Sequence, residues 1–136
     1  MNEIIVNKLD SSRLMNRLKL ARVNKSCQAS DAEKLTQELN RAKLCDPKKI
    51  PGDVITMNSI VRIYIPSMNS RKEIKLVYPE DANLKENKIS IFAPIAIALL
   101  GYRKGDEVDW TLPGGNKKIL IEEILFQPEA SGNYDL

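Results

Sequence analysis

Histidine is absent from the 136 residues, and the only cysteines are Cys27 and Cys45. Without histidine, the Ser-His-Asp and Cys-His nucleophile systems and the usual His-containing zinc sites are excluded. Two cysteines cannot complete an all-cysteine zinc site. Neither a GxxxxGK[ST] nor a GxGxxG phosphate-binding motif occurs. We therefore expect no enzyme, with no catalytic residue, no metal and no cofactor.

Long apolar runs are also missing. The early run Ile4-Ile5-Val6 is too short for the apolar core of a signal peptide. No stretch approaches the ~18 apolar residues that a membrane-spanning helix needs. The sequence thus predicts a soluble, cytoplasmic protein with no membrane partner.

Positive charge is concentrated in the N-terminal part of the chain. Residues 1–53 carry eleven Lys/Arg against seven Asp/Glu, a net +4, whereas residues 54–136 carry ten against eleven, a net −1. No acid lies between residues 11 and 30, and this basic arm holds Arg13, Arg17, Lys19, Arg22 and Lys25. Such an arm favours an acidic or nucleic-acid partner, and an ordinary solvated helix face has the same composition.

Two amphipathic segments precede the proline-containing linker at residues 45–53. The first runs from Asp10 or Ser11 to about Asn24, and the second starts at the capping box Ser30-x-x-Glu33 and runs to about Leu44. Each has one apolar stripe at helical spacing, made of Leu14, Leu18 and Ala21 in the first and of Ala32, Leu35, Leu39 and Ala42 in the second. Two such segments joined by a short polar loop predict an antiparallel helical hairpin.

The remainder of the chain has the pattern of strands around one short apolar helix. Strand character is found in residues 54–57, 59–65, 73–78, 89–92, 107–112 and 117–126. Residues 94–100 have no polar side chain on any face, and Gly101 suits the left-handed conformation that ends a helix. An apolar helix of this kind must be enclosed by protein. Residues 127–136 have no periodicity and are predicted to be only partly ordered.

Several short motifs occur in a fixed order along the chain. The C-terminal half holds Pro94, Leu99-Leu100-Gly101, Gly105-Asp106 with Val108, and Pro113-Gly114-Gly115, and the set extends to DVITMNS (53–59), LVYP (76–79) and QPEA (127–130). This ordered set resembles the Gre transcription elongation factors, and more closely their smaller Rnk relatives. The resemblance implies an FKBP-like antiparallel β-sheet around one short helix, preceded by a short coiled coil.

In Gre factors, a long N-terminal coiled coil enters the secondary channel of RNA polymerase, and acids at its tip help to bind a catalytic Mg²⁺. In this chain the hairpin tip has only Asp31 and Glu33, which lie about 200° apart around a helix. The D-x-x-E pattern of Gre tips is not matched. Ser30, Asp31 and Glu33 fit the ordinary roles of residues in a first helical turn. We therefore expect no strong stimulation of transcript cleavage.

The resemblance also implies a partner, the RNA polymerase core, bound at the rim of the secondary channel. The basic arm would contact nucleic acid only within the transcription complex. The turn residues Tyr102, Arg103 and Lys104 are our candidate docking site. An FKBP-like fold also suggests prolyl isomerase activity. However, the seven scattered aromatic residues do not outline the apolar pocket that this reaction needs.

We predict an α+β protein with a helical hairpin in residues 1–50 and an FKBP-like, Gre-type C-terminal domain in residues 51–136. Its predicted function is that of a transcription regulator that binds RNA polymerase, with no small-molecule substrate. Two alternatives remain. One is a Gre-type factor that promotes cleavage of backtracked RNA through Asp31 and Glu33. The other is a protein-interaction module that does not bind polymerase.

Overall fold

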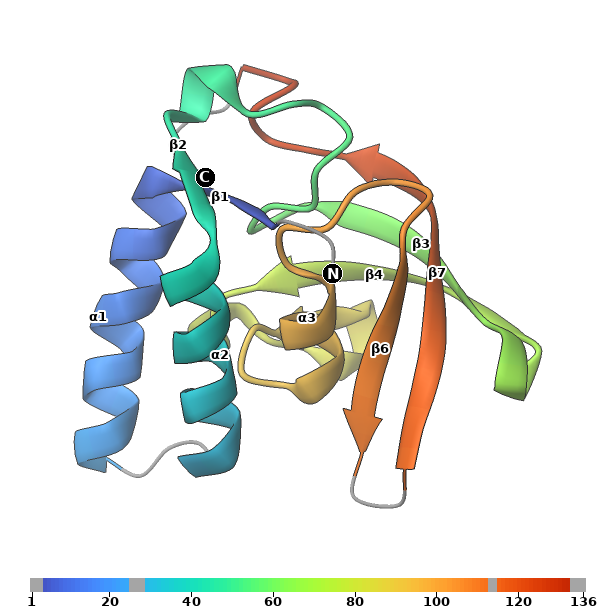
Figure 1. Cartoon of the computed structure of the whole chain (residues 1–136), viewed down its shortest axis with the longest axis horizontal. Helices are drawn as coiled ribbons and strands as arrows, with labels where there is room; N and C mark the ends of the chain where they lie inside the picture. Colours follow the sequence, from blue (N-terminus) through green and yellow to red (C-terminus); the bar gives the residue numbers. More distant parts are fainter. Residues whose placement is uncertain (1–3, 25–28, 113–114, 133–136) are drawn as a thin grey trace.

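The computed structural model describes residues 4–24, 29–112 and 115–132 (Figure 1). Its helices are α1 (Lys8–Asn24), α2 (Ala29–Arg41) and α3 (Pro94–Leu99), and its strands are β1 (Ile5–Asn7), β2 (Lys43–Cys45), β3 (Ile60–Ile65), β4 (Ser70–Val77), β5 (Lys88–Ser90), β6 (Glu107–Leu112) and β7 (Gly115–Phe126). Short 3-10 turns are η1 (Pro47–Lys49), η2 (Pro66–Met68), η3 (Pro79–Asp81) and η4 (Leu84–Glu86). The antiparallel hairpin α1–α2 lies on one side, a curled sheet on the other, and α3 between them (Figure 1).

The main sheet has the strand order β5-β4-β3-β7-β6. The pairs β3–β4, β3–β7 and β6–β7 are antiparallel, whereas β4–β5 is parallel. The predicted mixture of helices and a curled sheet is confirmed. The expectation of a wholly antiparallel sheet is wrong at β5, because the chain crosses over through η3 and η4 before β5 joins the edge. The descriptions FKBP-like and coiled coil stay predictions.

One hydrophobic cluster joins the helical hairpin to the sheet. The apolar stripes of both helices contribute Leu14, Leu18, Ala32, Leu35 and Leu39, and the same cluster includes Val61, Ile63, Leu76, Leu99, Ile119 and Ile121 from the β half. The two helices therefore pack along the β half, and their ends next to the connecting residues reach past α3 in the view of Figure 1. The division into residues 1–50 and 51–136 stays a prediction.

The short apolar helix α3 is enclosed over its last four residues. Ala96, Ile97, Ala98 and Leu99 are buried, whereas Pro94 is exposed and Ile95 half-buried, and Gly101 follows with φ +86°. The glycine lies where the chain passes β1, since the amide of Ile5 donates to the carbonyl of Gly101 at 3.1 Å. A side chain at this position would meet Ile4, so both the backbone angle and the close packing require glycine.

Two predicted elements differ from the structure near the linker. The second helix ends at Arg41 rather than near Leu44, because the next residues form β2, which pairs in parallel with β1. Residues 54–57 are buried but form no strand; only an isolated bridge joins Val54 to Arg103. Their backbone groups bond instead to loops and side chains, for example Ile55 N to Tyr102 O at 2.9 Å. The predicted strand at residues 54–57 is therefore wrong, because the segment bonds to loops and side chains rather than to a neighbouring strand.

The C-terminal segment is packed more closely than predicted. Gln127 and Glu129 are buried, and Gln127 Nε2 donates to the carbonyls of Pro51 and Val54 at 2.8 and 2.7 Å. Residues 127–130 are therefore held against the linker. Residues 133–136 lie outside the described part of the chain, and partial order of residues 127–136 as a whole stays a prediction. No helix among the described residues is long and apolar enough to cross a membrane.

Candidate functional site

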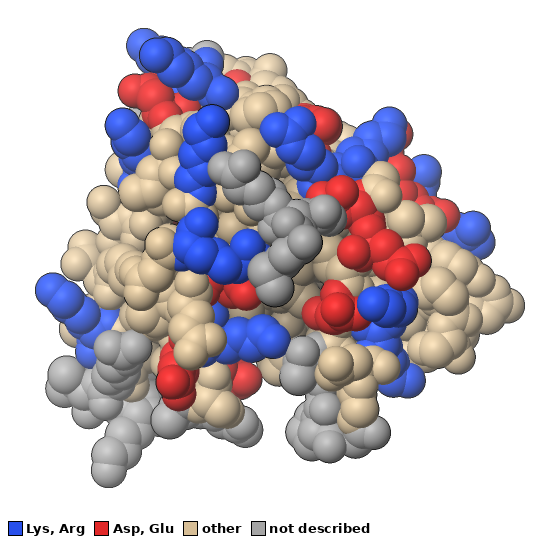
Figure 2. Space-filling view, viewed as in Figure 1, with Lys and Arg blue, Asp and Glu red and all other residues tan. Residues whose placement is uncertain are grey.

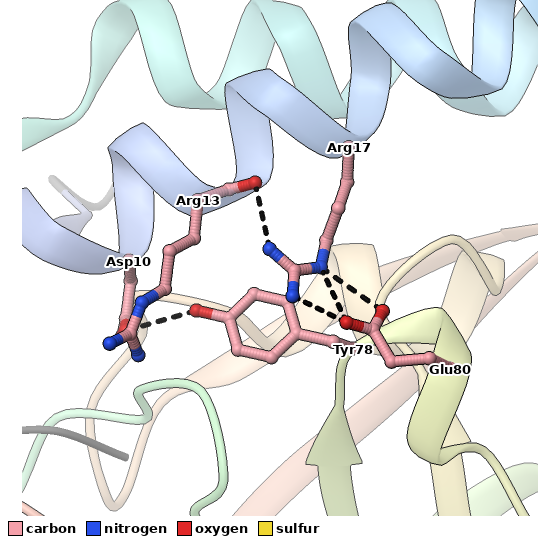
Figure 3. Close-up of polar contacts among 5 residues, drawn as sticks. All are labelled: Asp10, Arg13, Arg17, Tyr78 and Glu80. Atoms are coloured by element: carbon pink, nitrogen blue, oxygen red, sulfur yellow. Dashed lines mark hydrogen bonds and ion pairs between the residues drawn. The ribbon is translucent and has the colours of Figure 1, made fainter.

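Arg17 of the predicted basic arm is turned toward the β half (Figure 3). Its guanidinium carbon lies 4.0 Å from the centre of the Tyr78 ring, and its Nε donates to the two carboxylate oxygens of Glu80 at 3.1 and 3.2 Å. The hydrogen bond from Arg17 holds the pKa of Glu80 below its ordinary value. Both the ring face and the carboxylate attract a cation, so Arg17 attaches α1 to the segment that follows β4.

The other members of the basic arm are placed differently. Arg13 is half-buried and lies beside Asp10 and the Tyr78 hydroxyl (Figure 3). Lys19 is exposed on α1. The side chain of Arg22 and the whole of Lys25 lie outside the described residues. The arm thus includes residues that stabilise the attachment of the hairpin, and its proposed role toward RNA remains a prediction.

Ser30 and Asp31 lie in the first turn of α2, and Glu33 follows at the start of the next turn. The helix begins at Ala29, so Ser30 lies inside the first turn rather than at the capping position that the sequence suggested. Ser30 and Glu33 are exposed and Asp31 is half-buried. Within the described residues, no group of three or more Cys, Asp or Glu side chains is arranged to hold a metal ion.

The candidate docking residues Tyr102, Arg103 and Lys104 do not act as one unit. Arg103 forms an ion pair with Asp53 at 3.4 Å, and Lys104 forms one with Glu123 at 3.0 Å. The Lys104 ammonium holds the pKa of Glu123 below its ordinary value. Tyr102 points the other way, toward the hairpin, where its hydroxyl accepts a hydrogen bond of 2.9 Å from Arg41 of α2.

Tyr102 lines a cleft of about 420 Å³ between α2, α3 and the β6–β7 hairpin. The charged and polar lining is Lys34, Glu38 and Arg41 on α2, Glu107 and Asp109 on β6, and Asn116 on β7. On the face seen in Figure 2, Lys and Arg side chains gather over the α2–β2 side, and acidic side chains gather over the β6–β7 side. The two walls of the cleft therefore differ in charge, which favours a partner that carries both signs.

Glu129 is the centre of a buried group of polar side chains that joins four segments of the chain. Its carboxylate accepts hydrogen bonds from Asn7 Nδ2 at 2.6 Å and from Thr56 Oγ1 at 2.7 Å. Thr56 also contacts Ser59, with 3.0 Å between the two hydroxyl oxygens. We refer to the whole group as the polar joint; its members are Asn7, Asp10, Thr56, Ser59, Tyr78, Gln127 and Glu129.

Asp10 is the second carboxylate of the polar joint. It accepts hydrogen bonds from the amide of Met57 at 3.2 Å and from the Tyr78 hydroxyl at 3.3 Å. Burial, and next the negative charge of Glu129, raise the pKa of Asp10 to about 7. Burial and the charge of Asp10 likewise raise the pKa of Tyr78. A carboxyl group of this kind can bind and release a proton near neutral pH.

Sequence reasoning did not single out the polar joint. The motifs DVITMNS, LVYP and QPEA supplied Thr56, Tyr78 and Glu129, yet they served only as signs of a family resemblance. Glu129 lies 122 residues from its partner Asn7, so no local pattern could reveal the contact. The sequence did contain one signal for the polar joint. Each of these motifs places polar residues next to apolar residues that the fold had to bury.

Comparison with protein families identifies the β half. The model of a family described as "Transcription elongation factor, GreA/GreB, C-term" matches residues 50–126. The chain is also 42% identical over 104 residues to the regulator of nucleoside diphosphate kinase of Escherichia coli K12, the Rnk protein, covering 76% of each chain. The match to the smaller Rnk relatives that the motifs indicated is thus confirmed.

Longer relatives and a solved structure give the same result. The chain is 34% identical over 98 residues to the transcription elongation factor GreA of a Sulfurovum species, covering 72% of this chain and 60% of that protein. A GreA/GreB structure from Nitrosomonas europaea superposes with a TM-score of 0.72 at 37% identity, over 93% of this chain and all of that one. On the evidence of sequence and fold together, the chain belongs to the GreA/GreB family of transcription elongation factors.

Proposed function

We propose that this protein is a cytoplasmic transcription regulator that binds the RNA polymerase core near its secondary channel and does not strongly stimulate transcript cleavage. The observation that carries the proposal is the match of the GreA/GreB C-terminal family to residues 50–126, which contain all of the main sheet and α3. The FKBP-like description of residues 51–136 and the coiled-coil description of residues 1–50 are part of the same proposal.

The cleft is the docking surface in this proposal, and Tyr102 is its central contact. An aromatic side chain with a polar tip is well suited to an interface, because it offers apolar area and a hydrogen-bonding group together. The charged walls on α2 and β6 would orient the partner, and Arg103 and Lys104 would lie at the margin, where ion pairs contribute little to affinity.

The basic arm has two parts in this proposal. Arg13 and Arg17 hold α1 against the segment after β4, as their contacts with Tyr78 support. Lys19, and further along the sequence Arg22 and Lys25, would face RNA and phosphates in the channel. Point charges on such a surface contribute a salt-dependent attraction.

The tip of the helical hairpin supports the proposal that the protein does not strongly stimulate cleavage. Asp31 and Glu33 lie two positions apart near the start of α2, so their side chains diverge by about 200° and cannot bind one Mg²⁺ together. The helices have 17 and 13 residues, or lengths of about 25 and 20 Å at 1.5 Å per residue. A short arm with divergent carboxylates is poorly suited to organise a metal ion in a distant active centre.

Binding is tested by mixing the full chain with RNA polymerase core and measuring co-purification at low and at moderate salt. We expect a complex that weakens as salt is added, and Tyr102→Ala should reduce binding at least tenfold. Tyr64→Ala is the matched control, since Tyr64 lies outside the cleft and bonds to Asn69. Absence of a complex even at low salt would contradict the proposal and favour the alternative of an interaction module that does not bind polymerase.

Cleavage is tested on stalled, backtracked transcription complexes. We expect the nascent RNA to keep its length when the protein is added, and the protein to compete with a cleavage-stimulating GreA. Shortening of the RNA that is abolished by Asp31→Asn or Glu33→Gln would instead establish the Gre-type alternative. Ser30→Ala serves as the control, because it alters the same helical turn without removing a carboxylate.

A further inference from the structure

Two carboxylates lie buried in the polar joint. Asp10 is 1% exposed and Glu129 is 7% exposed. The hydrogen bonds described above reach them from uncharged groups, namely the Met57 backbone amide, the Tyr78 hydroxyl, the Asn7 side-chain amide and the Thr56 hydroxyl. Neutral donors stabilise one buried charge, but they do not neutralise two.

The charged groups around the pair do not balance it. From α1, Arg13 lowers the pKa of Asp10, but its effect is the smallest of those acting on that carboxyl. From the segment after β4, the titratable group is Tyr78, whose hydroxyl is held neutral by a raised pKa. Residues 54–59 contain no titratable side chain, and the C-terminal segment contributes Glu129 itself. Two negative charges and one partly solvated guanidinium leave an excess of negative charge.

We propose that the polar joint is a proton-dependent latch. At and below neutral pH, one proton on Asp10 leaves Asp10 and Glu129 with a single negative charge between them. When that proton is released, the two like charges repel, and the C-terminal segment and the start of α1 are held less firmly to residues 54–59. The latch lies at the base of the hairpin and is independent of any partner.

The position of Asp10 supports this coupling between charge and attachment. The same carboxylate holds the Met57 amide and the Tyr78 hydroxyl, so it links α1 to two separate segments of the β half. Glu129 links the C-terminal segment to Asn7, whose Oδ1 also accepts the Leu9 amide at the start of α1 at 2.8 Å. A change in charge at either carboxylate therefore acts on the base of the hairpin and on the C-terminal segment together.

The test compares the unfolding constants of the natural protein and Asp10→Asn by urea denaturation between pH 5 and pH 8. Asparagine resembles the protonated carboxyl in shape and charge, and Tyr78 can turn its hydroxyl to accept from the new amide. The pKa of Asp10 is raised from the ordinary value of 3.8 to about 7 in the folded protein. The stability that this shift contributes is complete below pH 3.8 and is lost as the pH rises to about 7. The folding equilibrium constant of the natural protein should therefore fall, relative to that of Asp10→Asn, about tenfold per pH unit up to about pH 6.5. Above about pH 7.5 the ratio of the two constants should level off.

Asp109→Asn is the matched control, because Asp109 is an exposed aspartate paired with Lys118. It should keep the pH profile of the natural protein. A direct measurement on the natural protein is the ¹³C chemical shift of the Asp10 carboxyl, which is expected to titrate near neutral pH. Hydrogen exchange should also show protection of the Met57 and Ala130 amides that falls as the pH rises toward about 7 and levels off above it. Titration of Asp10 near its ordinary value, or parallel curves for the natural protein and Asp10→Asn, would overturn the proposal.

Discussion

Thr56 donates a hydrogen bond of 2.7 Å to Glu129, a residue 73 positions further along the chain. Thr56 begins the buried turn that leads into β3, and Glu129 follows the last residue of β7 by three positions. The bond therefore joins the entry of the main sheet to its exit. Two motifs that the sequence offered only as signs of family, DVITMNS and QPEA, are two sides of one contact.

Thr56→Val tests the value of that contact. Valine has the same shape, so the main loss is the donor to the buried Glu129 carboxylate and the contact with Ser59. Leaving a buried polar group unpaired costs about 1–3 kcal/mol. We expect the free energy of unfolding, measured in urea, to fall by about 2 kcal/mol.

The matched control is Thr36→Val on α2. Thr36 donates to the carbonyl of Ala32 within the same helix and is only half-buried. The carbonyl keeps its helical partner, so the same substitution should change the free energy of unfolding by less than about 0.5 kcal/mol. Equal effects at both positions would contradict a specific role for the Thr56–Glu129 contact.

Gly101 and Gly105 separate the cost of a backbone angle from the cost of a clash. Their φ angles are nearly equal, +86° and +90°, but a Cβ at Gly101 would meet Ile4 Cβ at 2.8 Å and Ile5 O at 3.2 Å, whereas nothing lies within 4 Å at Gly105. Gly105→Ala should cost about 1 kcal/mol for the left-handed conformation alone. Gly101→Ala should cost about 3 kcal/mol, because overpacking is added. Thermal and urea unfolding of the two variants provide the comparison.

The elements that the sequence predicted well are those whose signals are local. Residues 107–112 alternate, follow a glycine turn, and form β6 with the predicted bounds. Residues 94–99 are apolar all round and end before a glycine in the left-handed conformation. In contrast, β2 exists because β1, which precedes α1 in the sequence and lies beside β2 in the fold, offers a partner. A short strand of this kind leaves no local signal, and the helical stripe that runs through Ala42 concealed it.

For the candidate site, too, the sequence predicted features with local signals and missed those that depend on distant contacts. Composition located the basic arm, but a count of charges cannot tell which face of a helix meets protein, and Arg17 proved to bind Glu80 and Tyr78. The docking role of the turn at residues 102–104 stays a prediction, and the structure separates Tyr102 in the cleft from two ion-paired neighbours. The polar joint depended on contacts across most of the chain, which only the fold supplies.

Arg17 and Glu80 allow the ring contact to be separated from the ion pair. The pair is partly solvated, with side-chain exposures of 28% and 55%, so its own contribution is at most about 0.5 kcal/mol. Glu80→Gln should therefore destabilise only slightly, and its effect should disappear as the pH falls, because a lowered carboxyl pKa stabilises only above the ordinary value of 4.5.

Arg17→Ala removes both interactions and should cost about 1 kcal/mol, since a partly exposed cation over an aromatic ring contributes about 0.5–1 kcal/mol. Lys19→Ala, on the exposed side of α1, is the control and should have almost no effect on stability. Urea denaturation of the three variants at pH 7 and pH 4 measures these differences. A loss for Glu80→Gln as large as that for Arg17→Ala would show that the ring contact adds nothing.

Gln127 tests whether the C-terminal segment stabilises the fold. Its amide nitrogen donates to the carbonyls of both Pro51 and Val54, and its Oε1 accepts the Ala130 amide at 3.1 Å. Gln127→Glu keeps the shape but places a buried carboxylate against two carbonyl oxygens, which should cost about 3 kcal/mol or more at neutral pH. Protonation restores a donor, so the loss should shrink as the pH falls toward 4.

Gln37→Glu, on the exposed face of α2, is the same substitution without burial and should be nearly neutral. Equal stability of the two variants at pH 7 would mean that residues 127–130 are not held to the linker in solution.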